Sequence, residues 1–301
     1  MPLVIDNLSK TYPNGTQALR NVSLTIPTGM FGLLGPNGAG KSSLMRTIAT
    51  LQDADTGSIW LDDLDVLRDK EAVRRVLGYL PQEFGVYPKI SAEEMLDHFA
   101  VLKGIANAKE RKEMVAALLH QTNLYEVRKK HVGGYSGGMK QRFGIAQALL
   151  GNPRLIIVDE PTAGLDPAER NRFHNLLADI GESLIVILST HIVSDVTDLC
   201  RNMAIISHGQ VRLTGDPLAL VEELRGQVWR KVVGKEEVAG LLAAGLPIIS
   251  TRLHAGRTVV HVLSEDRPDT GFEPVEADLE DVYFSEIRNA EVRIKTDRFV
   301  V

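Results

Sequence analysis

Short apolar runs alternate with amphipathic segments over the first two thirds of the chain. Val22, Leu24 and Ile26 alternate with polar residues, which is the period of a half-buried strand. Three further runs are apolar throughout, at residues 31–34, 155–158 and 184–188. Segments with the apolar spacing of helices follow the first two of these runs, around 44–51 and 173–180. Buried strands joined by amphipathic helices predict a parallel sheet with helices on both faces.

Residues 91–150 are predicted to be mostly helical. Ser91 and Glu94 have the spacing of a capping box at the start of one helix, and apolar residues between 114 and 119 line one face of the next. Because strand-like runs occur on both sides of this segment, we expect a helical subdomain inserted into an α/β core.

The pattern changes again near residue 220. Just before it, two apolar runs around His208-Gly209 predict a hairpin. After it come strand-like pieces at 228–233 and 258–263 and a helix at 236–244. We therefore predict two domains, residues 1–220 and 221–301, with the helical subdomain at about 91–150 and a small α+β fold in the second domain.

Composition and charge narrow the class of protein. The 301 residues are 44% hydrophobic and 24% charged, which is typical of a globular chain. The net charge of -5 argues against a general nucleic-acid binder. The single cysteine, Cys200, excludes an intramolecular disulfide and is expected to be a small core residue. The longest nearly apolar stretch, 238–249, is far shorter than the roughly 20 residues of a membrane span, so any role at a membrane is expected to come through a partner.

Residues 35–42 contain a phosphate-binding pattern, G-x-x-x-x-G-K-S. Glycines leave room for backbone N–H groups to converge on phosphate oxygens, and the helix that follows directs its positive end to the same place. The lysine reaches the β- and γ-phosphates, and the serine hydroxyl can ligate Mg²⁺. The predicted ATP-binding residues are Gly35, Pro36, Asn37, Gly38, Ala39, Gly40, Lys41, Ser42 and the adjacent Ser43.

Two acidic residues end the apolar run at 155–158. Asp159 is placed where the carboxyl end of a buried strand would present it to Mg²⁺, which bridges the β- and γ-phosphates. Glu160 follows it and can orient or deprotonate the attacking water. The sequence therefore predicts nucleotide hydrolysis.

A third motif, residues 135–142, reads Tyr-Ser-Gly-Gly-Met-Lys-Gln-Arg and resembles the signature of ATP-binding cassette (ABC) proteins, commonly L-S-G-G-Q. Tyr135 replaces the usual Leu and Met139 the usual Gln, while Ser136, Gly137 and Gly138 are intact. The resemblance covers about residues 1–220. It implies that the signature of one copy closes on the nucleotide bound to another copy, so that two chains sandwich two ATP molecules.

The resemblance also implies roles for four single residues. Gln82 is similar to the glutamine that senses Mg²⁺ and water, and His191 to the switch histidine that contacts the γ-phosphate. Asp166 lies in the segment that crosses to the other copy. Tyr12 occupies the place of an aromatic ring that stacks on adenine, although a tyrosine before Pro13 could equally serve packing.

The resemblance implies an export-type ABC transporter ATPase with ATP and Mg²⁺ as cofactors. Its implied fold is a P-loop core with an antiparallel β subdomain and an inserted helical subdomain. Its expected partners are a second nucleotide-binding subunit and separate membrane-spanning subunits, with no nucleic acid, which would place it on the cytoplasmic face of the membrane. Residues 277–284 are similar to the ending of export-type cassettes, or form an amphipathic helix packing on the tail. The alternative is a cytosolic ABC ATPase acting on ribosomes or DNA.

Overall fold

The computed structural model describes residues 2–85 and 87–297. It consists of two compact units, Met1–Val211 and Arg212–Val301, which are described separately below. The boundary between them falls inside the second strand of the predicted hairpin, earlier in the chain than residue 220. Within the described ranges, no helix is both long and apolar enough to cross a membrane.

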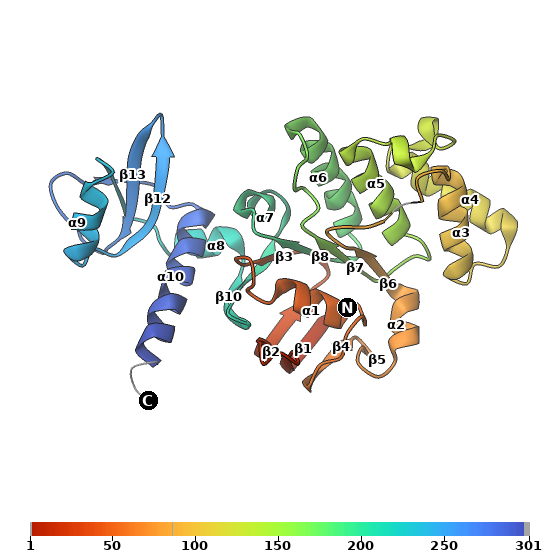
Figure 1. Cartoon of the computed structure of the whole chain (residues 1–301), viewed down its shortest axis with the longest axis horizontal. Coiled ribbons are helices and arrows are strands. Elements are labelled where there is room, and N and C mark those ends of the chain that lie inside the picture. The colour runs from red at the N-terminus through yellow and green to blue at the C-terminus, as the bar shows by residue number, and fades with distance from the viewer. Residues whose placement is uncertain (1, 86, 298–301) are drawn as a thin grey trace. The chain divides into compact units, whose positions relative to one another are not determined.

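A six-stranded sheet with the order β10-β9-β3-β8-β7-β6 organises the first unit (Figure 1). β3 pairs in parallel with β8 and β9, and β7 pairs in parallel with β6 and β8, which confirms the predicted parallel sheet. The unit boundary lies within the edge strand β10. The strands are β3 (Gly29–Leu34), β6 (Leu77–Leu80), β7 (Leu155–Asp159), β8 (Ile185–Thr190), β9 (Asn202–Ser207) and β10 (Gln210–Gly215).

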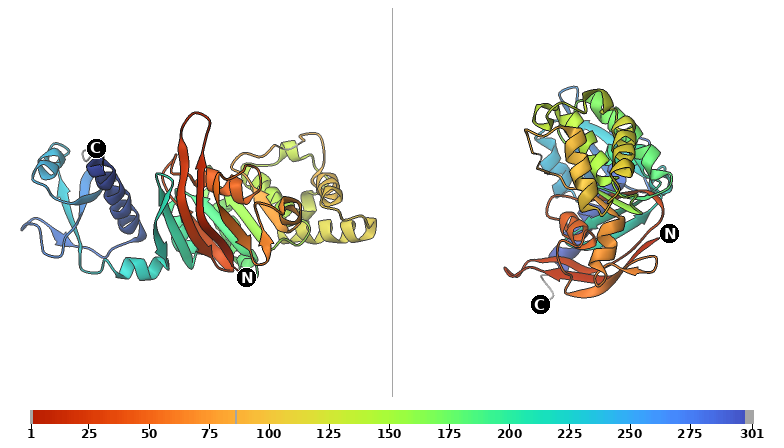
Figure 2. Two further views of the ribbon diagram at one scale, coloured as in Figure 1. Left: turned by 90° about the horizontal axis from the view of Figure 1, so that it is seen from below. Right: turned by 90° about the vertical axis from the view of Figure 1, so that its right-hand side faces the viewer.

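A second, antiparallel sheet has the order β2-β1-β4-β5 and forms the predicted β subdomain (Figure 2). Its strands are β1 (Leu3–Thr11), β2 (Gln17–Ile26), β4 (Thr56–Leu61) and β5 (Leu64–Asp65). Helix α1 (Lys41–Ile48) packs between the two sheets, because its Leu44, Met45 and Ile48 are fully buried in one core with residues of both. The helix that carries the phosphate loop is therefore fixed from both sides.

Three more helices complete the core: α2 (Lys70–Val76), α6 (Pro167–Gly181) and α7 (Val193–Leu199). Figure 1 shows α6 and α7 on the face of the central sheet opposite α1. Val196 of α7 packs directly over Gly32 of β3. Cys200, just after α7, is buried as predicted, and burial together with the charge of Asp195 raises the pKa of its thiol to about 12.

The segment between β6 and β7 is helical, as predicted. It contains α3 (Ala92–Leu102), α4 (Ala108–Gln121), two short 3₁₀ turns (Tyr125–Val127 and Val132–Gly134) and α5 (Gly137–Ala148). The capping box is present, since Ser91 Oγ accepts a hydrogen bond from the Glu94 backbone N–H and the Glu94 carboxylate accepts one from the Ser91 N–H. These helices pack around their own apolar core, which includes the buried ring of Phe143.

The second unit is a four-stranded sheet with the order β12-β13-β11-β14 and three helices. The elements are α8 (Pro217–Glu222), β11 (Val228–Val233), α9 (Glu237–Ala243), β12 (Ile248–His254), β13 (Arg257–Leu263), β14 (Glu273–Pro274) and α10 (Leu279–Asp297). Leu279, Val282 and Tyr283 of α10 are buried, so the amphipathic interpretation of residues 277–284 is confirmed. His261 of β13 contacts Asp281 of α10 at 2.8 Å, which ties the helix to the sheet.

We expect Ser91→Ala to lower the free energy of unfolding by about 1–2 kcal/mol, because it removes the side-chain cap of α3. Urea unfolding followed by circular dichroism measures the change. The control is Lys112→Ala at an exposed position of α4, which should change the same quantity by less than about 0.5 kcal/mol. Equal stability of Ser91→Ala and wild type would show that the capping box contributes nothing.

Candidate functional site

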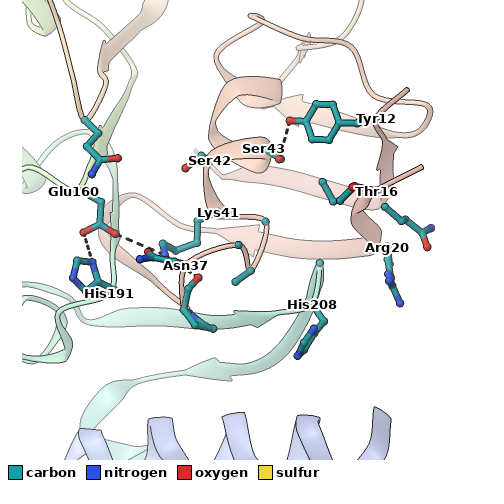
Figure 3. A pocket seen from close by; sticks show the side chains of 18 residues that line it. Tyr12, Thr16, Arg20, Asn37, Lys41, Ser42, Ser43, Glu160, His191 and His208 are labelled. Atoms are coloured by element: carbon teal, nitrogen blue, oxygen red, sulfur yellow. Dashed lines mark hydrogen bonds and ion pairs between the residues drawn. The ribbon is translucent and has the colours of Figure 1, made fainter. Parts of the chain in front are cut away.

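A cavity of about 490 Å³ lies over the loop that joins β3 to α1 (Figure 3). Most of the residues predicted to bind and hydrolyse ATP line it, although they come from five separate stretches of the sequence. The lining comprises Tyr12, Thr16, Gln17, Ala18, Arg20, residues 36–43, Gln82, Glu160, His191, His208 and Gly209.

The phosphate loop is held between strand β2 and the turn that joins β9 to β10. Gly40 has a φ of 109°, and a Cβ there would lie 2.5 Å from the carbonyl oxygen of Ala18 in β2. On the other side, the Gly209 N–H donates a hydrogen bond of 2.8 Å to the Ala39 carbonyl oxygen. Only glycine tolerates both the left-handed backbone conformation and the close approach of β2. Steric constraints therefore explain why residue 40 is a glycine.

The ammonium group of Lys41 is buried in the cavity. The residue is 6% exposed, and its Nζ donates to the Gly35 carbonyl oxygen at 2.6 Å. Burial lowers the pKa of Lys41, while the nearby carboxylates of Glu160 and Asp159 oppose that shift. Glu160 Oε1 lies 3.7 Å from Nζ. Because the charge is poorly hydrated, an anionic triphosphate would stabilise it strongly.

Asp159 is the last residue of β7 and is also buried. Burial raises the pKa of its carboxyl group, and the Ser189 hydroxyl, the charge of Lys41 and the Ser42 hydroxyl partly oppose the shift. The Asp159 Oδ1 atom is buried without a hydrogen-bond partner among the described residues. An unpaired carboxylate oxygen beside a serine hydroxyl suits Mg²⁺, which binds few protein oxygens and takes its other ligands from phosphate and water.

Glu160 and His191 are brought together from the ends of β7 and β8. Glu160 Oε2 lies 2.7 Å from His191 Nδ1, as drawn in Figure 3. Glu160 has a φ of 49°, a conformation that is unfavourable for a glutamate and persists only where the surrounding structure holds it. Its backbone N–H donates to the Ser189 carbonyl oxygen at 2.8 Å, which helps to hold it there. The Glu160 carboxylate is buried and the His191 imidazole is half exposed. Both side chains line the cavity.

Tyr12 and Gln82 lie at the edges of the same cavity. The Tyr12 hydroxyl contacts Ser43 Oγ at 2.9 Å (Figure 3). It also donates a hydrogen bond to Gln52 Oε1 at 3.1 Å. These bonds fix the ring beside the phosphate loop, while its stacking on adenine stays a prediction. Gln82 is exposed and follows β6, so its amide can reach the cavity from the opposite side.

The signature motif lies elsewhere in the same chain. Ser136 begins α5, where its Oγ accepts a hydrogen bond of 3.2 Å from the Met139 N–H. Ser136 and Gly137 are exposed, and neither Ser136–Gly138 nor Asp166 belongs to the described lining of the cavity. Asp166 caps α6 through a 2.9 Å bond from the Glu169 N–H. The two helix N-termini that the sequence predicts to bind anions, those of α1 and α5, therefore do not share this cavity.

The two departures from the usual signature have a local cause. Tyr135 is 5% exposed, packs in the core of the helical segment and donates to the Val127 carbonyl oxygen at 3.0 Å. Met139 packs against the same core. Both side chains therefore serve the interior of the helical segment, and the exposed Ser136-Gly137 face is not altered by them.

Several lining residues were not predicted from the sequence. Thr16 directly precedes β2, Gln17, Ala18 and Arg20 belong to its start, and His208-Gly209 form the turn of the predicted hairpin. The turn itself was predictable from its flanking strands. Its position beside the phosphate loop depends on the pairing of β9 with β3, a contact between distant segments that no local pattern encodes.

The geometry defines a P-loop ATPase: the phosphate loop, the buried Lys41 and Glu160 line one cavity at the edge of a parallel sheet, and Asp159 directly precedes Glu160 at the end of β7. The family model described as ABC transporter matches residues 19–163. The chain is 33% identical over 297 residues to the uncharacterized ABC transporter ATP-binding protein YxlF of Bacillus subtilis, covering 93% of this chain and 98% of YxlF. The chain therefore belongs to the ATP-binding proteins of ABC transporters and is an ATPase.

Two further similarities agree with this family. The chain is 32% identical over 269 residues to the probable multidrug ABC transporter ATP-binding protein YbhF of Escherichia coli, covering 88% of this chain but only 46% of YbhF. A dimeric structure of the cassette MJ0796 in a post-hydrolysis state, bound to ADP and Pi, has a TM-score of 0.64 and 28% identity. It covers 71% of this chain and 98% of that one.

We expect Asp159→Asn to stabilise the nucleotide-free protein at neutral pH while preventing hydrolysis. Because burial raises the pKa of Asp159 above its ordinary 3.8, the folded protein binds the proton more tightly than the unfolded chain. This carboxyl therefore contributes stability at low pH that is lost as the pH rises through the raised pKa. The advantage of the Asn variant in urea unfolding should grow over that range. Asp179→Asn, on the exposed face of α6, is the control and should show no such trend. An Asn variant less stable than wild type at pH 7 would contradict the prediction.

Proposed function

We propose that two copies of this chain clamp ATP between the phosphate loop of one copy and the Ser136–Gly138 helix end of the other. The observation that supports this most directly is that the two anion-binding ends of one chain are not on the same cavity. Backbone N–H groups at the start of a helix attract phosphate, and the exposed start of α5 leaves them accessible. The site is then complete only when two chains meet, with Asp166 in the segment that contacts the partner.

The chemistry follows from the positions of the side chains. Lys41 would bind the β- and γ-phosphates, and Tyr12 would stack on adenine. Ser42, Asp159 and Gln82 would hold Mg²⁺, which supplies positive charge to the phosphates when bound. Glu160 would accept a proton from the attacking water, because its carboxylate is directed into the cavity and lies within hydrogen-bond distance of His191. His191 would hold Glu160 in place and contact the γ-phosphate.

We further propose that separate membrane-spanning subunits bind an apolar groove of about 350 Å³ beside this site. Leu51 and Leu102 in the groove are 56% and 69% exposed, which is unusual for large apolar side chains on one surface. Leu51 follows the phosphate-loop helix α1, and Tyr79, also in the groove, is three residues before Gln82. A cytoplasmic helix of the membrane subunit seated there would sense both parts of the nucleotide site and hold the chain at the cytoplasmic face of the membrane.

The direction of transport is proposed to be export. The support is the name of YbhF, a probable multidrug transporter component, and the resemblance of residues 277–284 to the ending of export-type cassettes. The buried positions of this segment anchor α10 in the second unit. No observation favours action on ribosomes or DNA.

The composite site is tested by mixing two inactive variants. Gly137→Glu places a negative charge at the first residue of α5, where a Cβ meets no atom within 4 Å. Lys41→Ala removes the lysine that is proposed to contact the phosphates. In a mixed dimer, the intact loop of one chain faces the intact signature of the other. An equal mixture should show about a quarter of the wild-type rate, since half of the dimers are mixed and each has one intact site of two.

The matched control is Gly240→Glu in α9, another glycine with free space, which should keep wild-type activity. Inactivity of the mixture at every ratio, with each variant folded and able to dimerise, would refute the composite site. Full activity of Gly137→Glu alone would refute it as well.

The membrane partner is tested with Leu102→Glu. The introduced charge would be buried when the membrane subunit docks, so recovery of the chain with native membranes should fall by about tenfold or more. ATP hydrolysis by the isolated protein should stay within about twofold of wild type. Leu218→Glu, at a leucine of α8 that is 73% exposed, is the matched control. Unchanged membrane recovery of Leu102→Glu would rule out this groove as the docking surface.

A further inference from the structure

A further buried carboxylate lies outside the described lining of the nucleotide cavity. Asp195 lies on α7, four residues after His191, and has no exposed surface. Its Oδ2 accepts a hydrogen bond of 2.5 Å from the Thr162 hydroxyl. Its Oδ1 lies 2.9 Å from Arg170 Nε and 2.9 Å from His174 Nε2, both on α6. A buried carboxylate is tolerated only when such partners compensate its charge, and Asp195 has three of them.

The bond to Thr162 reaches the segment that carries Glu160. Thr162 is 4% exposed and lies two residues after Glu160, at the start of the segment that ends at Asp166. Two parallel links therefore join the same two stretches of chain: Glu160 to His191 at 2.7 Å, and Thr162 to Asp195 at 2.5 Å. The first link uses the reacting side chains and the second lies behind them.

The backbone of Glu160 requires such support. Its φ of 49° is unfavourable and persists only where the surrounding structure determines it. The 2.8 Å bond to the Ser189 carbonyl oxygen fixes Glu160 on its N-terminal side. On the C-terminal side, the Thr162 hydroxyl is the nearest side chain of the segment with a buried partner, and that partner is Asp195.

A purely structural ion pair is the simpler interpretation of Asp195. Arg170 and His174 would satisfy it, since both belong to the adjacent helix α6 and compensate the carboxylate without reaching the site. The contact with Thr162 is what this interpretation does not require. The Thr162 hydroxyl donates to Asp195 Oδ2, whereas Arg170 and His174 contact Oδ1. This bond connects Asp195 to the segment that carries Glu160.

We propose that Asp195 is a positioning residue for ATP hydrolysis, which acts through Thr162 to hold Glu160 in register with His191. The inference rests on the proposed catalytic role of Glu160. It predicts that loss of the Thr162–Asp195 bond lowers kcat and leaves ATP affinity unchanged, because neither residue belongs to the described lining of the cavity. A displaced general base is sufficient for a large loss of rate.

The test compares Thr162→Val with Thr162→Ser. Val keeps the branched shape and removes the hydroxyl, so kcat should fall about tenfold or more, with the ATP dissociation constant within about twofold of wild type. Ser keeps the hydroxyl and should retain kcat within about threefold. Asp179→Asn, at an exposed carboxylate of α6, is the control and should match wild type. If Thr162→Val does not fold, Thr162→Ala and Thr162→Ser provide the same comparison of a site with and without the hydroxyl.

A double-variant cycle adds a second criterion. Thr162→Val combined with Asp195→Asn should lower kcat no further than Asp195→Asn alone, because both act through one bond. Wild-type kcat in folded Thr162→Val, equal kcat in the hydroxyl-bearing and hydroxyl-free variants, or a parallel loss of ATP affinity would each overturn the positioning role.

Glu160→Gln is measured in the same series, to separate the failure of this inference from the failure of the proposed function. Wild-type turnover in that variant would overturn the catalytic role of Glu160 and this inference together, whereas an inactive Glu160→Gln with an active Thr162→Val overturns the inference alone.

Discussion

The buried ammonium group of Lys41 is the interaction around which the nucleotide site is built. A cation with this little hydration needs nearby carbonyl and carboxylate oxygens, and Gly35, Asp159 and Glu160 provide them in the nucleotide-free protein. The same requirement fixes helix α1, which carries Lys41 and is enclosed between two sheets. A triphosphate would therefore enter a site whose charges and backbone are already in position, so little reorganisation is needed when it binds.

The local features of the fold followed from the sequence because short-range rules determine them. The capping box at Ser91, the apolar strand before Asp159 and the glycines of the phosphate loop each depend on neighbours within a few residues. The features that sequence reasoning missed depend on distant pairings. Ala18 and Gly209 reach the loop through the pairing of separate strands, and Asp195 meets Thr162 only after α7 packs beside α6. Hydrophobic periodicity contains no information on such contacts.

The substitutions at the signature motif illustrate the same distinction. From the sequence, Tyr135 and Met139 were departures whose effect on the family mechanism was open. In the structure both side chains face the interior of the helical segment, where Tyr135 is buried and hydrogen-bonded to Val127. The unusual residues at these two positions therefore affect packing inside the helical segment. The exposed Ser136 and Gly137 still offer the hydroxyl and the backbone N–H groups that an anion requires. The identity of a residue in a motif thus matters less than the surface to which it contributes.

The buried position of Cys200 has a practical consequence. Its thiol is buried and has a pKa of about 12, so it is poorly reactive toward maleimides at neutral pH, and it is the single cysteine of the chain. The native protein can therefore serve directly as the background for site-specific labelling. Fluorophores or spin labels attached to cysteines introduced on α5 and beside the phosphate loop would report the approach of two chains in real time, without first removing a native thiol.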